Sequence, residues 1–293
     1  MAKPRAILKR RKAVQNIAKI TKTMQMIATA KFKRSFDRAV AARPYTDRLT
    51  SLIGRLAQAA GSFEHPLLAA REPKRAAVLA VASNRGLCGG YNSNVGKRLT
   101  AVRAQLAARG LPVEIHASGK KLGGMLRFLK VPTAALHRHF EDKPTYAQVD
   151  EVMSELVRRY EAGEIDELWV VYTKFESASR QRAVAEKVLP LTLAGGAAGP
   201  DAPPAAEGAL ALFDPDPATI LSDLLPRSVR MHAFQAFLDA AVSEQTARMV
   251  AMKAATDNAR DMIKALTMIY NRSRQTLITT ELSEIMGGAA ALE

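Results

Sequence analysis

Hydrophobic residues recur at alternating intervals of four and three along residues 227 to 286, a stretch of sixty positions without glycine or proline. This spacing predicts a single helix with one continuous seam. At 1.5 Å per residue the helix would be roughly 90 Å long, whereas a compact globule of this chain length would be about 50 Å across. We therefore expect it to protrude. The predicted seam comprises Leu238, Val242, Gln245, Met249, Met252, Thr256, Ala259, Ile263, Leu266, Tyr270, Ser273, Leu277 and Thr280.

A second long helix is predicted at the other end of the chain. Residues 5 to 43 also lack glycine and proline, and Ile17, Ile20, Met24 and Ile27 follow one another at intervals of three, four and three. Two such helices can pair antiparallel if the segment between them folds into a compact body. We expect a shaft built from residues 1–60 and 217–293, with a kink near Pro226 because proline interrupts helical hydrogen bonding.

The middle of the chain, residues 74–193, has the pattern of a small α/β domain. Short apolar runs alternate with helical segments, which favours a Rossmann-like, mainly parallel sheet covered on both faces. Residues 194–216 are rich in Ala, Gly and Pro and are expected to form a loop. Predicted strands are 76–82, 112–117, 167–173 and 184–193, the last at an edge because of Pro190; predicted helices are 94–109, 120–129 and 146–161.

Positive charge is concentrated near the N-terminus. Residues 1 to 48 hold fourteen Lys and Arg against two Asp, out of a net charge of +15 for the chain. Such asymmetry indicates an acidic partner surface, nucleic acid or anionic lipid. Few aromatic residues stand among these charges, which weakens the nucleic-acid alternative, and no apolar run is long enough to insert into a membrane. The predicted basic face includes Lys9, Arg10, Lys19, Lys22 and Lys31.

A glycine-rich turn is the one motif that suggests nucleotide chemistry. Gly86, Gly89 and Gly90 follow a predicted strand and precede a helix, where backbone amides could bind phosphate. A P-loop, however, would need glycine at Tyr91 and a hydroxyl residue at Arg98. We therefore interpret the glycines as a structural turn, and keep a nucleotide-hydrolysing enzyme that uses this turn as one alternative.

Other chemical groups favour surface or structural roles. His137 and His139 could form half of a metal site, but no third ligand has suitable spacing, so both are interpreted as solvated surface histidines. The acidic residues of 164–167 are read as ordinary surface charge. The single cysteine, Cys88, excludes an intrachain disulfide and is interpreted as a small buried residue. No cofactor, metal or catalytic residue is predicted.

Several long motifs resemble the gamma subunit of F-type ATP synthases, and the resemblance spans nearly the whole chain. They are VQNIAKITKTMQMIATA at 14–30, RGLCGGYN at 85–92, SEQTARMVAMKAATDN at 243–258, YNRSRQTLITTELSEI at 270–285 and the closing GGAAA at 287–291. The resemblance implies a central shaft, one copy per complex, inside a hexamer of alpha and beta subunits. Its base would contact the epsilon subunit and the c-ring, so that proton flow drives rotation and ATP synthesis.

The same resemblance implies contacts and a location. Arg274, Gln275 and Thr279 match positions that contact a beta-subunit catch loop, whereas Arg248 and Met24 match positions that tune coupling. The protein would be non-catalytic and peripheral on the cytoplasmic face of a bacterial inner membrane. The segment 194–217 and Pro226 depart from the family pattern, and the cysteine pair of the plastid proteins is absent. The alternative is a basic coiled-coil protein that binds nucleic acid.

Overall fold

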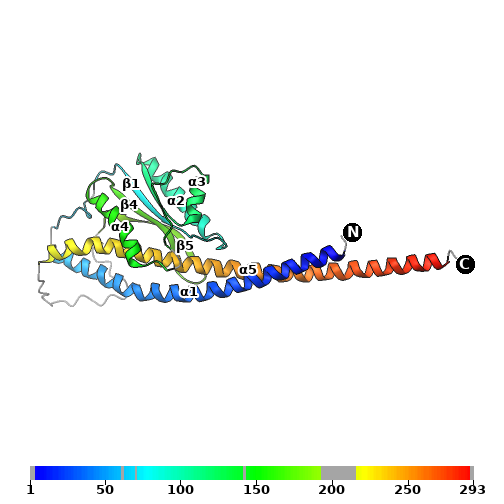
Figure 1. The fold of residues 1–293 in the computed structure, drawn as a ribbon. Coiled ribbons are helices and arrows are strands. Elements are labelled where there is room, and N and C mark those ends of the chain that lie inside the picture. Colours follow the sequence, from blue (N-terminus) through cyan, green and yellow to red (C-terminus); the bar gives the residue numbers. More distant parts are fainter. Residues whose placement is uncertain (1–3, 61–62, 70, 141–142, 193–215, 291–293) are drawn as a thin grey trace. The chain divides into compact units, whose positions relative to one another are not determined.

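The computed structural model describes residues 4–60, 63–69, 71–140, 143–192 and 216–290. The chain divides into two compact units. The coil unit comprises residues 1–30 and 248–293, and the sheet unit comprises residues 31–247. Helices α1 (Pro4–Ala60) and α5 (Pro217–Ala290) each contribute to both units (Figure 1).

A five-stranded sheet organises the sheet unit, in the order β3-β2-β1-β4-β5. All neighbouring strands are parallel except β4 and β5, which are antiparallel. The chain reverses its direction of strand addition after β3, so the boundary between β1 and β4 is a topological switch point. The strands are β1 (Ala76–Val81), β2 (Val113–Ser118), β3 (Ala135–His137), β4 (Glu167–Phe175) and β5 (Gln181–Leu189).

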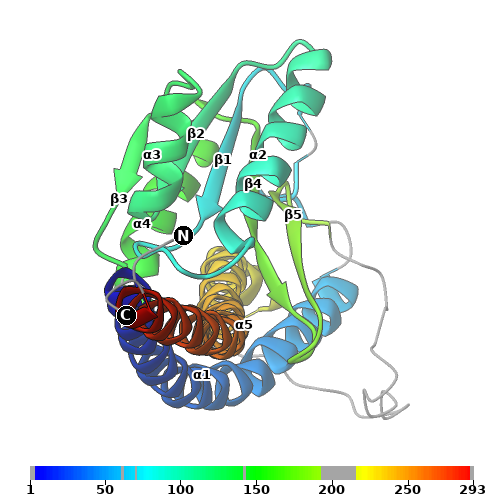
Figure 2. The same ribbon diagram turned by 90° about the vertical axis from the view of Figure 1, so that its right-hand side faces the viewer.

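Helices cover both faces of the sheet, which is why the central strand β1 is apolar at every position and buried throughout. On one face α2 (Tyr91–Ala108) and α3 (Lys120–Phe128) pack against Val78 and Ala80. On the other face α4 (Tyr146–Glu161) and parts of α1 and α5 pack against Leu79. Figure 2 shows α2 and α3 in front of the sheet and α4 behind it.

The predicted α/β elements are confirmed, with one difference. The short strand β3 was missed, because three half-buried residues carry little periodicity. Both Pro44 and Pro226 lie inside helices, so α5 continues through Pro226 without a break, and the predicted kink there stays a prediction. The expected edge strand is confirmed as β5, which ends just before Pro190. Of the predicted loop 194–216, all but residue 216 lies outside the described residues.

In the coil unit, the two helices pair antiparallel, as the sequence predicted. The Arg11 guanidinium lies 5.5 Å from the centre of the Tyr270 ring, and further along α1 the hydroxyls of Thr21 and Thr256 are 2.8 Å apart. Residue numbers therefore increase along α1 in the direction in which they decrease along α5, as in an antiparallel pair. One apolar cluster of this seam is formed by the buried residues Ile7, Val14, Ala259 and Leu266.

The predicted seam of α1 is wrong, whereas that of α5 is confirmed as far as Ser273. Ile17, Ile20 and Ile27 are 52%, 60% and 51% exposed. The positions facing α5 include instead the heptad series Ile7, Val14, Thr21 and Ala28, in which the last two residues are small. The small residues Thr21 and Ala28 allow close approach of the two helices, whereas Ile17, Ile20 and Ile27 remain on the outer surface.

Candidate functional site

The C-terminal part of α5 is exposed on every side. Residues 274 to 287 are all exposed, including large apolar side chains such as Leu282, Ile285 and Met286. In the coil unit this segment runs beyond the start of α1 (Figure 1). A helix with a large uncovered apolar surface is typical of a segment that another protein surrounds.

Three residues predicted to contact a partner lie in this exposed segment. Within the described chain, neither the Arg274 guanidinium nor the Gln275 side-chain amide has a hydrogen-bond or ion-pair partner. The Thr279 hydroxyl donates to the Gln275 carbonyl oxygen at 2.9 Å, a bond within the helix. Arg274 and Gln275 therefore keep all their side-chain donors for an external surface.

The two predicted coupling residues have different environments. Arg248 is only 8% exposed and makes interactions within the protein. Met24 is half-buried and lines a shallow surface depression with Lys19, Ile20 and Thr23. Met24 is therefore accessible to a partner, whereas the Arg248 side chain is almost entirely covered by its own chain.

The predicted basic residues are mostly solvent-exposed. Lys9, Arg10 and Lys19 are exposed, and Lys22 is exposed with its ammonium 3.4 Å from the Gln25 side-chain oxygen. Lys31 is half-buried and has a partner in the protein. Four of the five charges can thus act on an approaching molecule, and the fifth is partly committed to its own chain.

The glycine turn joins β1 to α2. Of its three glycines only Gly89 has a left-handed backbone, with φ of 55°, and Gly90 is the residue that precedes the first turn of α2. The hydroxyl of the buried Tyr91 donates to the Ala240 carbonyl oxygen in α5 at 3.2 Å. Tyr91, which occupies the place of a P-loop glycine, is therefore an anchor between the sheet layer and α5.

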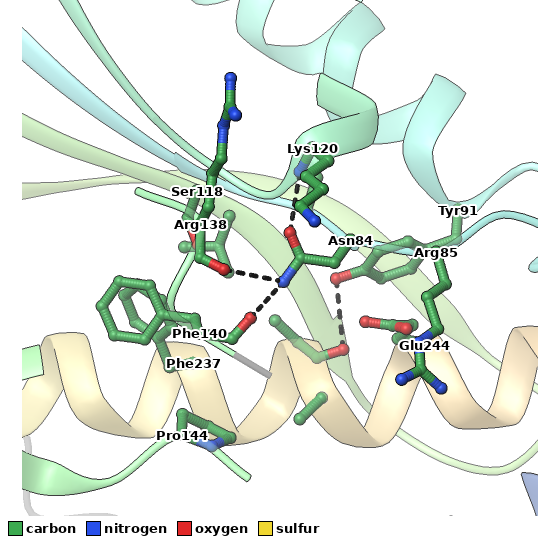
Figure 3. A pocket seen from close by; sticks show the side chains of 14 residues that line it. Asn84, Arg85, Tyr91, Ser118, Lys120, Arg138, Phe140, Pro144, Phe237 and Glu244 are labelled. Carbon is green, nitrogen blue, oxygen red and sulfur yellow. Dashed lines mark hydrogen bonds between the residues drawn. The ribbon is translucent and has the colours of Figure 1, made fainter. Parts of the chain in front are cut away.

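A pocket of about 170 Å³ lies at the carboxyl ends of the parallel strands. Its walls come from the residues after β1 and β2, from the segment after β3, and from Phe237, Ala240, Ala241 and Glu244 of α5 (Figure 3). Asn84 organises this edge: its side-chain oxygen accepts from the Lys120 amide at 3.0 Å, and its nitrogen donates to the Arg138 and Phe140 carbonyl oxygens. Sequence reasoning missed Asn84, although a polar residue just after a buried parallel strand was an available signal.

The histidines and carboxylates only partly match their predicted surface roles. His137 is half-buried, and burial is the main reason that its pKa lies below the ordinary value, with His116 and His139 adding to the effect. Glu167 is 4% exposed and accepts two hydrogen bonds from the Arg109 guanidinium, at 2.8 and 3.1 Å. The surface interpretation is therefore wrong for His137 and Glu167. It overlooked that both residues belong to covered strands.

The described part of the chain was also searched for a metal site and for a membrane-spanning helix. Among those residues, no group of three or more His, Cys, Asp or Glu could hold a metal ion. No helix within them is long and apolar enough to cross a membrane. The buried Cys88 lies 3.2 Å from the Asn92 side-chain nitrogen, consistent with the predicted structural role.

Comparison with known proteins relates the whole chain to one family. The family profile described as ATP synthase matches residues 3–292. The ATP synthase gamma chain of Rhodopirellula baltica is 46% identical over the full length of both chains, and that of Desulfitobacterium hafniense is 39% identical, again over both full lengths.

Solved structures share the fold at low sequence identity. A chain of the Euglena gracilis mitochondrial ATP synthase rotor matches 94% of this chain and 98% of its own length, with a TM-score of 0.66 and 18% identity. A central stalk and c-ring structure from Tetrahymena thermophila matches 80% of this chain with a TM-score of 0.58. Full-length similarity, the paired terminal helices and the α/β sheet agree, and this chain belongs to the ATP synthase gamma chain family.

Proposed function

We propose that this protein is the central rotor shaft of an F-type ATP synthase, coupling proton flow through a c-ring to ATP synthesis and hydrolysis in an alpha/beta hexamer. The observation that carries the proposal is full-length identity of 46% to an ATP synthase gamma chain. The antiparallel helices of the coil unit and the exposed end of α5 supply the mechanical parts. It would be one non-catalytic copy per complex.

The coil unit is suited to transmit torque without chemistry of its own. Two helices packed along a continuous seam bend less readily than one, because bending would have to separate the packed side chains. Their outer surfaces differ: exposed isoleucines and lysines lie along α1, whereas α5 beyond Ser273 is exposed on every side and carries large apolar side chains among polar ones. A rotating element with unequal sides can present a different surface to each of three surrounding subunits in turn.

Arg274 and Gln275 are proposed to contact the beta-subunit catch loop, with Thr279 beside them. An arginine with free donors binds carboxylates through two parallel hydrogen bonds, and this is the type of contact that resists sliding. Met24 and Arg248 are proposed to tune coupling, Met24 from the surface and Arg248 through its contacts within the protein. The exposed lysines of α1 would face acidic loops of the same subunits.

The test replaces Arg274 and Gln275 together by alanine in the assembled complex. We expect ATP-driven rotation or proton pumping to fall about tenfold or more, because the lost charge-assisted hydrogen bonds each contribute roughly 1.5–3 kcal/mol and about 1.4 kcal/mol corresponds to a factor of ten. The control replaces Arg260 and Lys264, exposed residues of α5 whose ion pairs are with Asp257 and Asp261 of the same helix. Unchanged coupled turnover in the double variant, or an equal loss in the control, would remove the two residues from the contact.

The sheet unit is proposed to join the shaft to the epsilon subunit and the c-ring, on the cytoplasmic face of a bacterial inner membrane. Co-purification with alpha and beta subunits tests the assembly directly. Binding to unrelated DNA with a steep salt dependence would favour the basic nucleic-acid-binding alternative. ATP hydrolysis by the purified chain alone would favour an enzyme that uses the turn at Gly86–Gly90.

A further inference from the structure

The pocket at the carboxyl edge of the sheet carries an excess of positive charge. Arg85, Lys120 and Arg138 line it, and among the described residues of the lining Glu244 is the acidic one; residues 141–142, between the lining residues Phe140 and Pro144, lie outside the described part. In Figure 3 the Arg138 guanidinium points away from α5, and the Arg85 side chain extends toward Glu244. Both Arg85 and Glu244 make interactions within the protein. Lys120 is therefore the lining cation that is available to a ligand.

Two donors in the pocket lack partners in the structure. Among the described residues, neither the Lys120 ammonium nor the Ser118 hydroxyl has a hydrogen-bond or ion-pair partner. Ser118 is 1% exposed, and its hydroxyl is not among the fully buried polar atoms that lack a partner, so the little surface that this residue keeps is available in the pocket that it lines. A buried hydroxyl and a free ammonium in one pocket together match an anionic acceptor.

The position in the fold supports the same conclusion. The pocket lies beyond the carboxyl ends of β1 and β2, one strand from the switch point between β1 and β4. Doubly wound sheets bind their ligands at this edge. Ser118 ends β2 and Lys120 begins α3, so both residues stand at the carboxyl edge of the sheet, two positions apart in the chain.

The geometry excludes the usual way in which this fold holds a nucleotide. The first amides of α3 are already used, since the Lys120 amide donates to the Asn84 side chain and the Lys121 amide to the Ser83 carbonyl oxygen. The glycines of the turn, 86 to 90, do not line the pocket. Its volume of about 170 Å³ also falls below the roughly 300–1,000 Å³ typical of pockets for drug-sized ligands.

We propose that this pocket binds a small phosphate-like oxyanion, held by the Lys120 ammonium and the Ser118 hydroxyl. Bound there, the anion lies between the sheet edge and residues 237–244 of α5, which form the opposite wall. Because it binds the folded sheet unit and not the unfolded chain, it stabilises the packing of this part of α5 against the sheet. This role goes beyond the rotor function and needs no other subunit.

The experiment is a calorimetric titration of the purified full-length chain with inorganic phosphate at constant ionic strength. We expect saturable binding with one site, and a rise in the thermal midpoint of unfolding that saturates over the same concentrations. Lys120→Gln should raise the dissociation constant about tenfold, and Ser118→Ala should raise it several-fold, since each removes one hydrogen bond to a charged ligand. Ser118→Ala adds no bulk, so it tests the site even if the lysine variant is perturbed.

The matched control is Lys97→Gln, because Lys97 is exposed on α2 and does not line the pocket. It should leave phosphate binding unchanged while lowering the net charge by the same amount as Lys120→Gln. A parallel titration with ADP separates free phosphate from the phosphate of a nucleotide. Absence of saturable phosphate binding, an equal loss in Lys97→Gln, or tighter binding of ADP than of phosphate would each overturn the proposal.

Discussion

Glu114 is held at the sheet surface by a charged network that links β2 to α4. Its two carboxylate oxygens accept from the Arg159 guanidinium at 2.7 and 2.9 Å, and one of them lies 2.8 Å from the His116 ring nitrogen. The hydrogen bonds from Arg159 are the main reason that the pKa of Glu114 falls to about 2, and those from His116 add to the effect. Because Arg159 also bonds Glu164, one guanidinium organises both carboxylates.

A pH dependence of stability follows from this pKa. The pKa is lower in the folded protein than its ordinary value of 4.5, so the stabilisation is present above about pH 4.5 and is lost as the pH falls toward 2. Glu114→Gln should therefore flatten the loss of unfolding free energy over that window. At pH 7 it should cost roughly 1–2 kcal/mol, a value reduced for the partial exposure of the pair. Chemical denaturation at a series of pH values measures both effects.

The control for this prediction is Glu155→Gln. Glu155 also bonds an arginine of α4, Arg158, but both side chains are largely exposed, at 52% and 69%. Exposed ion pairs contribute little, so the control should change stability by less than about 0.5 kcal/mol. Equal effects of the two substitutions would show that the Glu114 network does not stabilise the fold.

The environments of single residues were harder to predict from the sequence than the helices and strands. Tyr91 and Asp239 illustrate the reason. The pattern around Tyr91 showed that it was not a phosphate-binding glycine, but not that its hydroxyl would reach Ala240, 149 positions away. Asp239 is 4% exposed on α5, and burial is the main cause that raises its pKa. Both environments depend on long-range packing, which no local pattern encodes.

At the scale of elements, the coil unit shows how a helix seam can mislead. The seam of α5 contains large apolar residues and could be predicted. The seam of α1 is a heptad series that includes Thr21 and Ala28, whereas Ile20 and Ile27 are exposed one position earlier. The large isoleucines were assigned to the seam because hydrophobicity is the signal from which a buried helix face is predicted. Close helix approach selects for small residues instead.

Because the two helices pack closely along this seam, we expect that a larger side chain at a buried seam position destabilises the coil unit. Ala259 is 4% exposed, so Ala259→Leu should force the helices of the coil unit apart and destabilise them by about 1–3 kcal/mol. Ala265→Leu is the control, because Ala265 is exposed on the same helix. Thermal unfolding followed by circular dichroism would measure the difference. Similar stability of the two variants would contradict the assignment of the seam.

At the scale of the whole molecule, the sequence predicted the arrangement of elements better than it predicted the environments of single residues. Stretches without glycine and proline predicted both long helices. Short apolar runs that alternate with helical segments predicted four of the five strands and the three shorter helices. These features are strong because they depend on many residues at once. The contacts of Arg274 and Gln275 with other subunits remain a proposal, since partner surfaces leave no periodic signal in a single chain.

The distribution of charge over the molecule predicts how it finds an acidic partner. Lys9, Arg10, Lys19 and Lys22 are exposed in the coil unit. Replacing all four by glutamine should slow association with an alpha/beta hexamer about tenfold at low salt, and the difference should shrink as added salt shortens the screening length. Stopped-flow mixing at several ionic strengths would measure the association rates.

The dissociation rate should change much less, because exposed charges at the rim of an interface steer encounters more than they hold the complex. A control variant in which four basic residues of the sheet unit are replaced by glutamine shows whether the position of the charges or only the net charge of the chain sets the association rate. Both variants lose four charges from a chain of net charge +15, so they differ only in where the charge is removed. If the two slow association equally, attraction depends on total charge and the basic residues of α1 have no special part in it. The control replaces Lys97, Arg98, Arg103 and Arg127.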